Sequence, residues 1–321
     1  MIRLALIEAG RRVIDFASAL PHVSGLQVHA VVDTDGDTAR AAADQLNAGV
    51  AVASLEELLA NHADAIDAVA IYAPIAVRPD LACQAAQAGK HLLVDAPLAA
   101  TFAQADTAIE KCRSSAAYLQ TAADLRFLPS SQTIRQRLDA GKLGDPGLVR
   151  LHHWRSSHDS ATSFSALVAG EVDLVNWLYS ARPELVFATA KPEDSSAYAQ
   201  LHLGYSAGGM AVIDVSRTLP SGSAPYYSLT LIGAAGAAYA DDHHNVQLLY
   251  HGGNPTAVTT GTGSHGLRNQ LRCFAAGVAG EGDFEQAATE TRSTVAVTAA
   301  AAASLEAQRP ARLAGDDYDL I

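Results

Sequence analysis

The first 121 residues contain four short apolar runs, and these constrain the fold more than any other feature of the chain. The runs lie at 4–7, 26–32, 68–72 and 91–94, with helical stretches between them. Apolar strands without polar alternation are buried on both faces, which is typical of a parallel sheet covered by helices. Repeated strand–helix units with short connections therefore predict a doubly wound parallel sheet.

The pattern changes after residue 121. The expected strands are 148–154, 186–189, 199–205, 211–216, 228–232 and 246–250. Several of them alternate apolar and polar residues, as an antiparallel sheet with one wet face does. A helix is expected over 166–179, and two more close the chain. We therefore predict an α/β chain with two domains. Residues 1–121 form the parallel domain, and residues 122–321 form an α+β domain with an open, mostly antiparallel sheet.

Composition narrows the possible partners. The 321 residues carry a formal net charge of −12, with 49% hydrophobic and 17% charged residues. An acidic chain lacks the clustered Lys and Arg that nucleic acid or anionic lipid requires. No apolar stretch approaches the roughly 20 residues of a membrane span, and the first ten residues do not resemble a signal peptide. We expect no nucleic-acid or membrane partner and a cytoplasmic location.

The three cysteines, at 83, 112 and 273, are widely spaced and match no metal-ligand pattern. We interpret them as small apolar residues in a reducing compartment. The pair His152-His153 lacks a third ligand at a convincing spacing, so we predict no metal site. Strand alternation places His153 and Arg155 on one face and His152 and Trp154 on the other.

Three segments carry a family resemblance. Residues 82–101 read ACQAAQAGKHLLVDAPLAAT, residues 126–129 read RFLP ahead of the GKLG at 141–144, and Asp173 precedes Trp177-Leu178. With these segments the chain resembles the Gfo/Idh/MocA family over nearly its whole length. The resemblance implies an N-terminal Rossmann domain for NAD(P) and a small-molecule ligand in the interdomain cleft. It also implies a homo-oligomer formed through the sheet of the second domain.

The cofactor positions depart from the family pattern. A Rossmann fingerprint has three glycines, but Glu8-Ala9-Gly10-Arg11-Arg12-Val13 keeps only the middle one. Glu8 brings negative charge to the pyrophosphate site, although Arg11 and Arg12 could offset it. We therefore predict no cofactor or weakly bound NAD(P). If a dinucleotide binds, the implied positions are Gly10, Arg11, Asp33, Pro74 and Pro97. Asp33 is equally explained as a ribose ligand or as a turn residue.

The residues of the family's chemistry are also replaced. Its E-K-P triplet is Asp95-Ala96-Pro97 here, and alanine cannot move a proton. The helix positions for the family's Asp, Gly and His are occupied by Ala166, Val168 and Gly170. The remaining candidates for acid–base chemistry are His158, Glu171 and Asp95. Glu171 follows the lost histidine, but one residue along a helix is about 100° around it, so Glu171 should point elsewhere.

Three classes of function remain open. The first, which we favour because these polar residues are lost together, is a pseudo-oxidoreductase with non-redox chemistry or a supporting role. The second is an NAD(P)-dependent dehydrogenase or reductase of a sugar, polyol or related carbonyl compound, with a rearranged site. The third is a ligand-sensing regulatory protein. Fold alone does not decide between them.

Overall fold

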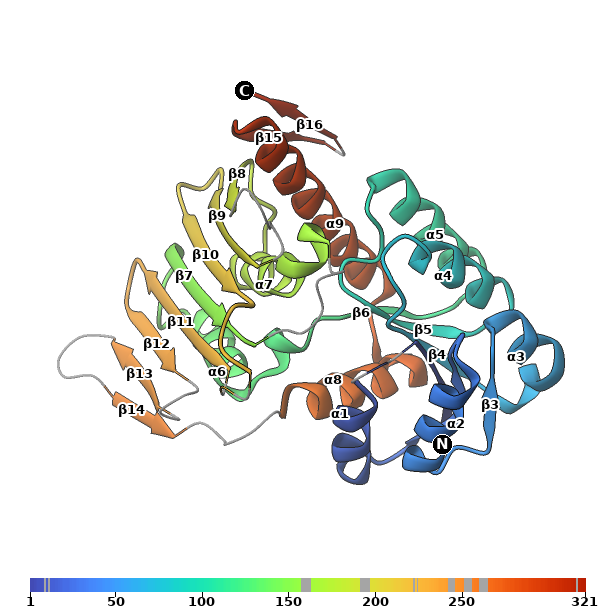
Figure 1. Cartoon of the computed structure of the whole chain (residues 1–321). Helices are drawn as coiled ribbons and strands as arrows, with labels where there is room; N and C mark the ends of the chain where they lie inside the picture. The colour runs from blue at the N-terminus through green and yellow to red at the C-terminus, as the bar shows by residue number, and fades with distance from the viewer. Residues whose placement is uncertain are drawn as a thin grey trace. The chain divides into compact units, whose positions relative to one another are not determined.

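The computed structural model divides the chain into two compact units (Figure 1). The N-terminal unit comprises Met1–Asp124 and Gly266–Arg292, and the C-terminal unit comprises Leu125–His265 and Ser293–Ile321. The structure describes residues 1–8, 10, 12–156, 163–190, 197–221, 223, 225–241, 246–250, 256–259, 265–315 and 317–321. Among these residues, no helix is long and apolar enough to cross a membrane.

A six-stranded parallel sheet forms the centre of the N-terminal unit. Its strands are β1 (Ile2–Ile7), β2 (Leu26–Val32), β3 (Val50–Val52), β4 (Ala68–Ile71), β5 (His91–Asp95) and β6 (Leu119–Ala122). They lie in the order β3-β2-β1-β4-β5-β6, and every pair is parallel. This is the strand order of a dinucleotide-binding Rossmann fold, and it confirms the doubly wound sheet predicted from the apolar runs.

Helices cover both faces of this sheet. They are α1 (Arg12–Ala19), α2 (Gly36–Leu46), α3 (Leu55–His62), α4 (Arg78–Gln87), α5 (Phe102–Ser114), α8 (His265–Ala276) and the first part of α9 (Phe284–Ala307). Short turns η1 (Leu20–His22), η2 (Ala63–Ala65) and η4 (Gly277–Glu281) complete the unit. Phe16 of α1 and Phe274 of α8 are fully buried in one apolar cluster with Leu4 and Leu6 of β1.

The N-terminal unit includes a segment that we expected in the second domain. The predicted domain boundary lies between residues 121 and 122, whereas this unit continues to Asp124 and also includes residues 266–292. Leu267, Leu271 and Phe274 of α8 pack against the core of the first sheet, and α8 lies beside α1 (Figure 1). The amphipathic pattern of α8 predicts that one face is buried, but it does not say against which sheet.

A ten-stranded sheet forms the C-terminal unit. Its strands are β7 (Pro146–Trp154), β8 (Leu185–Ala190), β9 (Tyr198–Gly204), β10 (Met210–Ser216), β11 (Tyr226–Gly233), β12 (Ala237–Asp241), β13 (Val246–Tyr250), β14 (Thr256–Thr259), β15 (Ala311–Ala314) and β16 (Asp317–Leu320). Their order is β14-β13-β12-β11-β7-β10-β9-β8-β15-β16. Among the described strand pairs of this sheet, only β7 and β10 are parallel, which confirms a mostly antiparallel sheet.

The two faces of this sheet differ. One face packs against α6 (Pro129–Asp139), α7 (Phe164–Tyr179) and the second part of α9. On the other face Trp154 stacks on Tyr226 with ring centroids 4.8 Å apart. Tyr198, Met210 and Ile232, which share that face by register, are 44%, 55% and 46% exposed. The alternation predicted from the sequence therefore separates a helix-covered face from an open face.

A buried ion pair ties α7 to the short turn η3 (Asp124–Phe127). Arg126 donates to both carboxylate oxygens of Asp173, and its Nε lies 2.7 Å from Oδ2. The two residues are 9% and 2% exposed, so water cannot replace either partner. Breaking a buried pair by removing one partner is strongly destabilising because the other charge stays behind.

We therefore expect Asp173→Ala to lower the free energy of unfolding by about 3–5 kcal/mol. Asp37→Ala is the matched control, because the Arg40–Asp37 pair has side chains that are 67% and 93% exposed. That variant should leave the unfolding midpoint nearly unchanged. Urea unfolding followed by fluorescence measures both. Equal losses in the two variants would contradict the assignment of Arg126–Asp173 as a buried structural pair.

Candidate functional site

The carboxyl edge of the parallel sheet is the candidate cofactor site. In open parallel sheets, ligands bind outside the carboxyl ends of the strands where the strand order reverses. Here the reversal lies between β1 and β4. Glu8 follows β1, Tyr72 follows β4 and Asp95 ends β5, so these side chains come to the same edge.

Two described residues after β1, Glu8 and Gly10, have the positive φ that suits a dinucleotide loop. Gly10 has a φ of 47°, and a Cβ there would meet nothing within 4 Å, so a phosphate can approach the backbone. Glu8 has a φ of 48° although it is not a glycine, and its amide donates to the Val32 carbonyl at 2.9 Å. The left-handed conformation costs an ordinary residue about 1–2 kcal/mol. The positive φ at these two residues is therefore compatible with a dinucleotide, and Glu8 adds a negative charge beside them.

Glu8 and Val13 occupy the positions of the first and third glycines of the Rossmann fingerprint, so one adds a charge and the other adds bulk. Burial raises the pKa of Glu8, and the neighbouring charge of Asp33 raises that pKa further. Val13 is 7% exposed and packs in the core cluster with Phe16, where it fills the space at the third glycine position. The role of Asp33 as a turn residue is visible, since its Oδ1 accepts from the Asp35 amide at 2.9 Å. The predicted role of Arg11 lies outside the described residues.

Arg12 lies in a cage of aromatic and acidic groups. Its Nη1 is 3.1 Å from Oδ2 of Asp124, and its guanidinium lies 5.3 Å from the ring centroid of Tyr72. Burial by itself lowers the pKa of Arg12, but Asp124, Tyr72 and Asp95 raise it by more. Arg12, one of the two cations that could offset Glu8, is thus already paired within the N-terminal unit. This pair could not be predicted from local sequence patterns, because Arg12 and Asp124 are 112 residues apart.

Asp95, one of the predicted catalytic residues, is held by Arg78. Arg78 is 3% exposed and donates to Oδ2 of Asp95 at 2.9 Å. It also donates to the carbonyls of Ala73, Asp95 and Pro97 at 3.0, 2.9 and 2.6 Å. Burial raises the pKa of Asp95, although Arg78 and Arg12 oppose that shift. Arg78 therefore fastens the ends of β4 and β5, and Asp95 is its structural partner.

The two predicted prolines lie at this same edge. Pro74 follows β4, and its carbonyl accepts from the amides of Val77 and Arg78 at 3.0 and 3.2 Å. Pro97 follows Ala96 through a cis peptide bond. Ala96 itself is 6% exposed, so the residue at the position of the family's lysine is a buried methyl group.

In the C-terminal unit, Glu171 contacts a partner that we did not predict. Its Oε1 lies 2.6 Å from Nδ1 of His153, and this contact joins α7 to the end of β7. Glu171 points to the helix-covered face of the sheet, where His153 lies. At Gly170 an added Cβ would meet only Leu125, at 3.7 Å. His158, the remaining predicted catalytic residue, lies outside the described residues.

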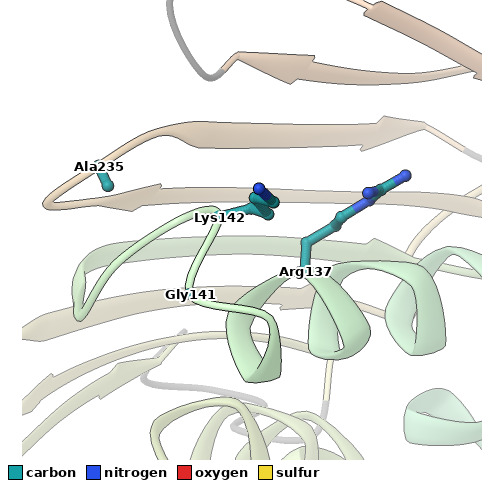
Figure 2. A pocket seen from close by; sticks show the side chains of 4 residues that line it. All are labelled: Arg137, Gly141, Lys142 and Ala235. Carbon is teal, nitrogen blue, oxygen red and sulfur yellow. The ribbon is translucent and has the colours of Figure 1, made fainter.

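A separate pocket of about 280 Å³ lies at the end of α6 (Figure 2). Arg137, Gly141, Lys142 and Ala235 line it, and Arg137 extends from α6 while Lys142 belongs to the following loop. Its lining holds two cations but neither a carboxylate nor an imidazole. The pocket therefore shares no residue with the sites predicted from the sequence.

Comparison with known proteins identifies the family of residues 2–122. They match the model of the oxidoreductase family with an NAD-binding Rossmann fold. Inositol 2-dehydrogenase 1 of Saccharopolyspora erythraea is 32% identical over 209 residues, which span 63% of this chain and 61% of that relative. The rhizopine catabolism protein MocA of Rhizobium meliloti is 28% identical over 258 residues, 74% of this chain and 78% of that protein. Residues 2–122 therefore form a Rossmann domain of the Gfo/Idh/MocA oxidoreductase family.

The fold extends that likeness to the second unit. An oxidoreductase from Agrobacterium radiobacter, solved in complex with NAD+, L-tartaric acid and magnesium, matches with a TM-score of 0.84. Its sequence is 16% identical, and the match covers 97% of this chain and 98% of that chain. At this identity the likeness concerns the fold alone.

The raised pKa of Glu8 predicts a pH-dependent effect on stability. When a carboxyl group has a higher pKa in the folded than in the unfolded protein, its stabilising contribution is complete at pH values below the unfolded-state pKa. That contribution is lost as the pH rises through the folded-state pKa. Glu8→Gln should therefore match the parent protein near pH 3 and be more stable near pH 7. Thermal unfolding at the two pH values measures this.

Asp33→Asn tests whether the stability gain of Glu8→Gln comes from the charge of Glu8. Asp33 adds to the raised pKa of Glu8, so the stability gain from Glu8→Gln should shrink when Asp33 is already neutral. A gain that is the same at both pH values would show that the charge of Glu8 is not the source.

Proposed function

We propose that the protein is an NAD(P)-dependent oxidoreductase of a sugar, polyol or related carbonyl compound, with an acid–base group that differs from the family's lysine. The observation that carries this proposal is the loop after β1. Its backbone keeps positive φ at Glu8 and Gly10 on a sheet with the dinucleotide-binding strand order. A relative that is an inositol 2-dehydrogenase supports the substrate class.

The chain's own residues define how a dinucleotide would be held. The Gly10 backbone would face the pyrophosphate, and Asp33 would face a ribose hydroxyl while keeping its turn with Asp35. When bound, the nicotinamide supplies the hydride acceptor or donor. Glu8 places a negative charge beside the phosphates, and Arg12 is already paired with Asp124. We therefore propose that binding is weak.

A second candidate function is a pseudo-oxidoreductase, and one observation favours it. Ala96 is buried where the family has its lysine, and the neighbouring carboxylate of Asp95 is engaged by Arg78. Such a protein would bind a small-molecule ligand without hydride transfer. The ligand-sensing role stays a prediction from the sequence. A single experiment on binding and turnover separates the first two.

We expect weak binding of NAD(H) and NADP(H) to the parent protein and at least about tenfold tighter binding to Glu8→Gly, equivalent to about 1.4 kcal/mol. Glu8→Gln removes only the charge and separates it from the backbone effect. Val13→Gly is unsuitable because it would open a hole in the core cluster. Calorimetry gives the affinities, and nicotinamide absorbance with myo-inositol, other polyols and sugars gives turnover. Tight binding without any turnover would favour the pseudo-oxidoreductase.

We also propose that the open face of the second sheet pairs with a second copy of the chain. Met210 and Ile232 on that face are 55% and 46% exposed. Replacing both by Glu should lower the molar mass measured by light scattering. Ile14→Glu is the matched control, because Ile14 is 64% exposed on α1 of the other unit. A parent protein that is monomeric at tens of micromolar would refute the pairing.

A further inference from the structure

The GKLG segment at 141–144 forms part of a pocket in the C-terminal unit that has no part in the proposed function. The pocket has a volume of about 280 Å³ and is lined by Arg137, Gly141, Lys142 and Ala235. These residues come from the end of α6, the loop that follows it and the turn between β11 and β12. All four belong to one unit, so the pocket does not depend on where the N-terminal unit lies.

Hydrogen bonds and a close backbone approach fix the wall of this pocket. The carbonyl of Arg137 accepts from the amide of Lys142 at 2.9 Å, which closes the end of α6. The amide of Ala235 donates to the carbonyl of Leu143, also at 2.9 Å, which ties the loop to the β11–β12 turn. At Gly144, with a φ of 65°, an added Cβ would lie 2.7 Å from the Ala235 nitrogen, so the approach requires glycine. The amides of Lys142 and Ala235 are thus already engaged, and a ligand would meet the side chains.

The two cations of the pocket differ from a neighbouring arginine on the same helix. Nη2 of Arg135 lies 2.7 Å from Oδ1 of Asp139, and its Nη1 lies 2.6 Å from the carbonyl oxygen of Trp177. Asp139 is the one carboxylate in the sequence of α6, and it is therefore taken. Within the described part of the chain, no side-chain hydrogen bond or ion pair engages Arg137 or Lys142.

Two unpaired cations in one pocket are unexpected in an acidic chain. The sequence has 34 Asp and Glu against 22 Lys and Arg, so carboxylates outnumber the cations that they could pair with. Both side chains extend in the same direction from α6 and its loop (Figure 2). Two like charges that line one pocket repel each other, and an anion between them removes that repulsion. The last turn of a helix favours a cation such as Arg137, but this does not account for the pocket beside it.

We propose that this pocket binds the phosphate group of a small molecule, held by the Arg137 guanidinium and the Lys142 ammonium. The planar guanidinium can donate two parallel hydrogen bonds to phosphate oxygens, and the ammonium adds a second positive charge. A phosphate group carries about −1.5 to −2 charges at pH 7, which two cations match, whereas a single carboxylate leaves one cation uncompensated. A volume of about 280 Å³ lies just below the usual range for drug-sized ligands, so the ligand is small. The proposal does not depend on the oxidoreductase function.

Calorimetry on the full chain tests this proposal at low ionic strength, because salt screens exposed cations. The probes are orthophosphate, glycerol 3-phosphate and succinate. We expect one phosphate site per chain with a Kd of about 1 mM or below, and weaker binding of succinate. The tighter of the two phosphate probes shows whether the site takes a free or an esterified phosphate. Absence of saturable phosphate binding overturns the proposal, as does succinate binding at least as tight as that of both phosphate probes.

Substitutions of the two cations locate the bound phosphate. Arg137→Gln and Lys142→Gln should each weaken phosphate binding by about tenfold or more, because a hydrogen bond to a charged group is lost. Lys111→Gln is the matched control, since Lys111 lies in the last turn of α5 in the other unit. It should leave the affinity unchanged. An equal loss in all three variants would reveal a general effect of charge and would overturn the site.

A charge-neutral substitution separates the pocket from its charges. Ala235→Leu should narrow the pocket and weaken phosphate binding, whereas Ala234→Leu, in the same turn but outside the lining, should not. Thermal unfolding checks that each variant is folded. Unchanged phosphate binding in the folded double variant Arg137→Gln/Lys142→Gln would mean that phosphate binds elsewhere, for example at the Gly10 loop, and would overturn the proposal. Failure of the parent protein to turn over any substrate refutes the oxidoreductase function alone.

Discussion

The need to pair every charge that is taken out of water links the fold of this protein to its candidate sites. Burying an isolated charge costs far more than a folded domain can supply, so among the described residues the two buried arginines each meet a carboxylate from another segment. Arg78 meets Asp95 at the ends of β4 and β5, and Arg126 meets Asp173 between η3 and α7. His153 meets Glu171 between β7 and α7. The three pairs fasten the strand ends and the helix on which the family's chemistry is built.

These pairs lie next to the replaced positions. Asp95 precedes Ala96, and Glu171 follows Gly170. Buried polar pairs therefore stand beside both positions at which the sequence departs from the family pattern. Stability alone does not account for them, because a packed apolar core would be at least as stable. Binding of a polar ligand would account for them, and this is the reason for proposing a rearranged oxidoreductase first.

The sequence predicted the parallel sheet and the central strands of the second sheet because their signals are local. Apolar runs and period-two alternation need no knowledge of distant residues. The short strands β3, β14, β15 and β16 have three or four residues each, too few for a periodic signal. The apolar face of α8 packs against the parallel sheet of the N-terminal unit. The sequence of the helix predicts that this face is buried, but not which of the two sheets it contacts.

The site was predictable only in part for the same reason. Helix periodicity could not identify His153 as the partner of Glu171, because His153 lies 18 residues earlier on a strand. Nor could it find that Arg12 and Arg78 are committed to Asp124 and Asp95. Charge pairs between segments are set by tertiary packing, so a list of titratable residues overestimates how many remain available to a ligand.

Glu8 has a positive φ, a backbone conformation that suits glycine better than glutamate. A glycine at this position adopts positive φ at no cost, whereas glutamate does so under strain. The strain is sustained because the Glu8 amide is fixed to Val32 on the neighbouring strand, and Gly10 turns the chain directly afterwards. The positive φ of Glu8 is therefore fixed by the β1–β2 pairing and does not depend on a glycine at this position. At Glu8 the backbone geometry and the side-chain charge are thus separate features, and a substitution can change one without the other.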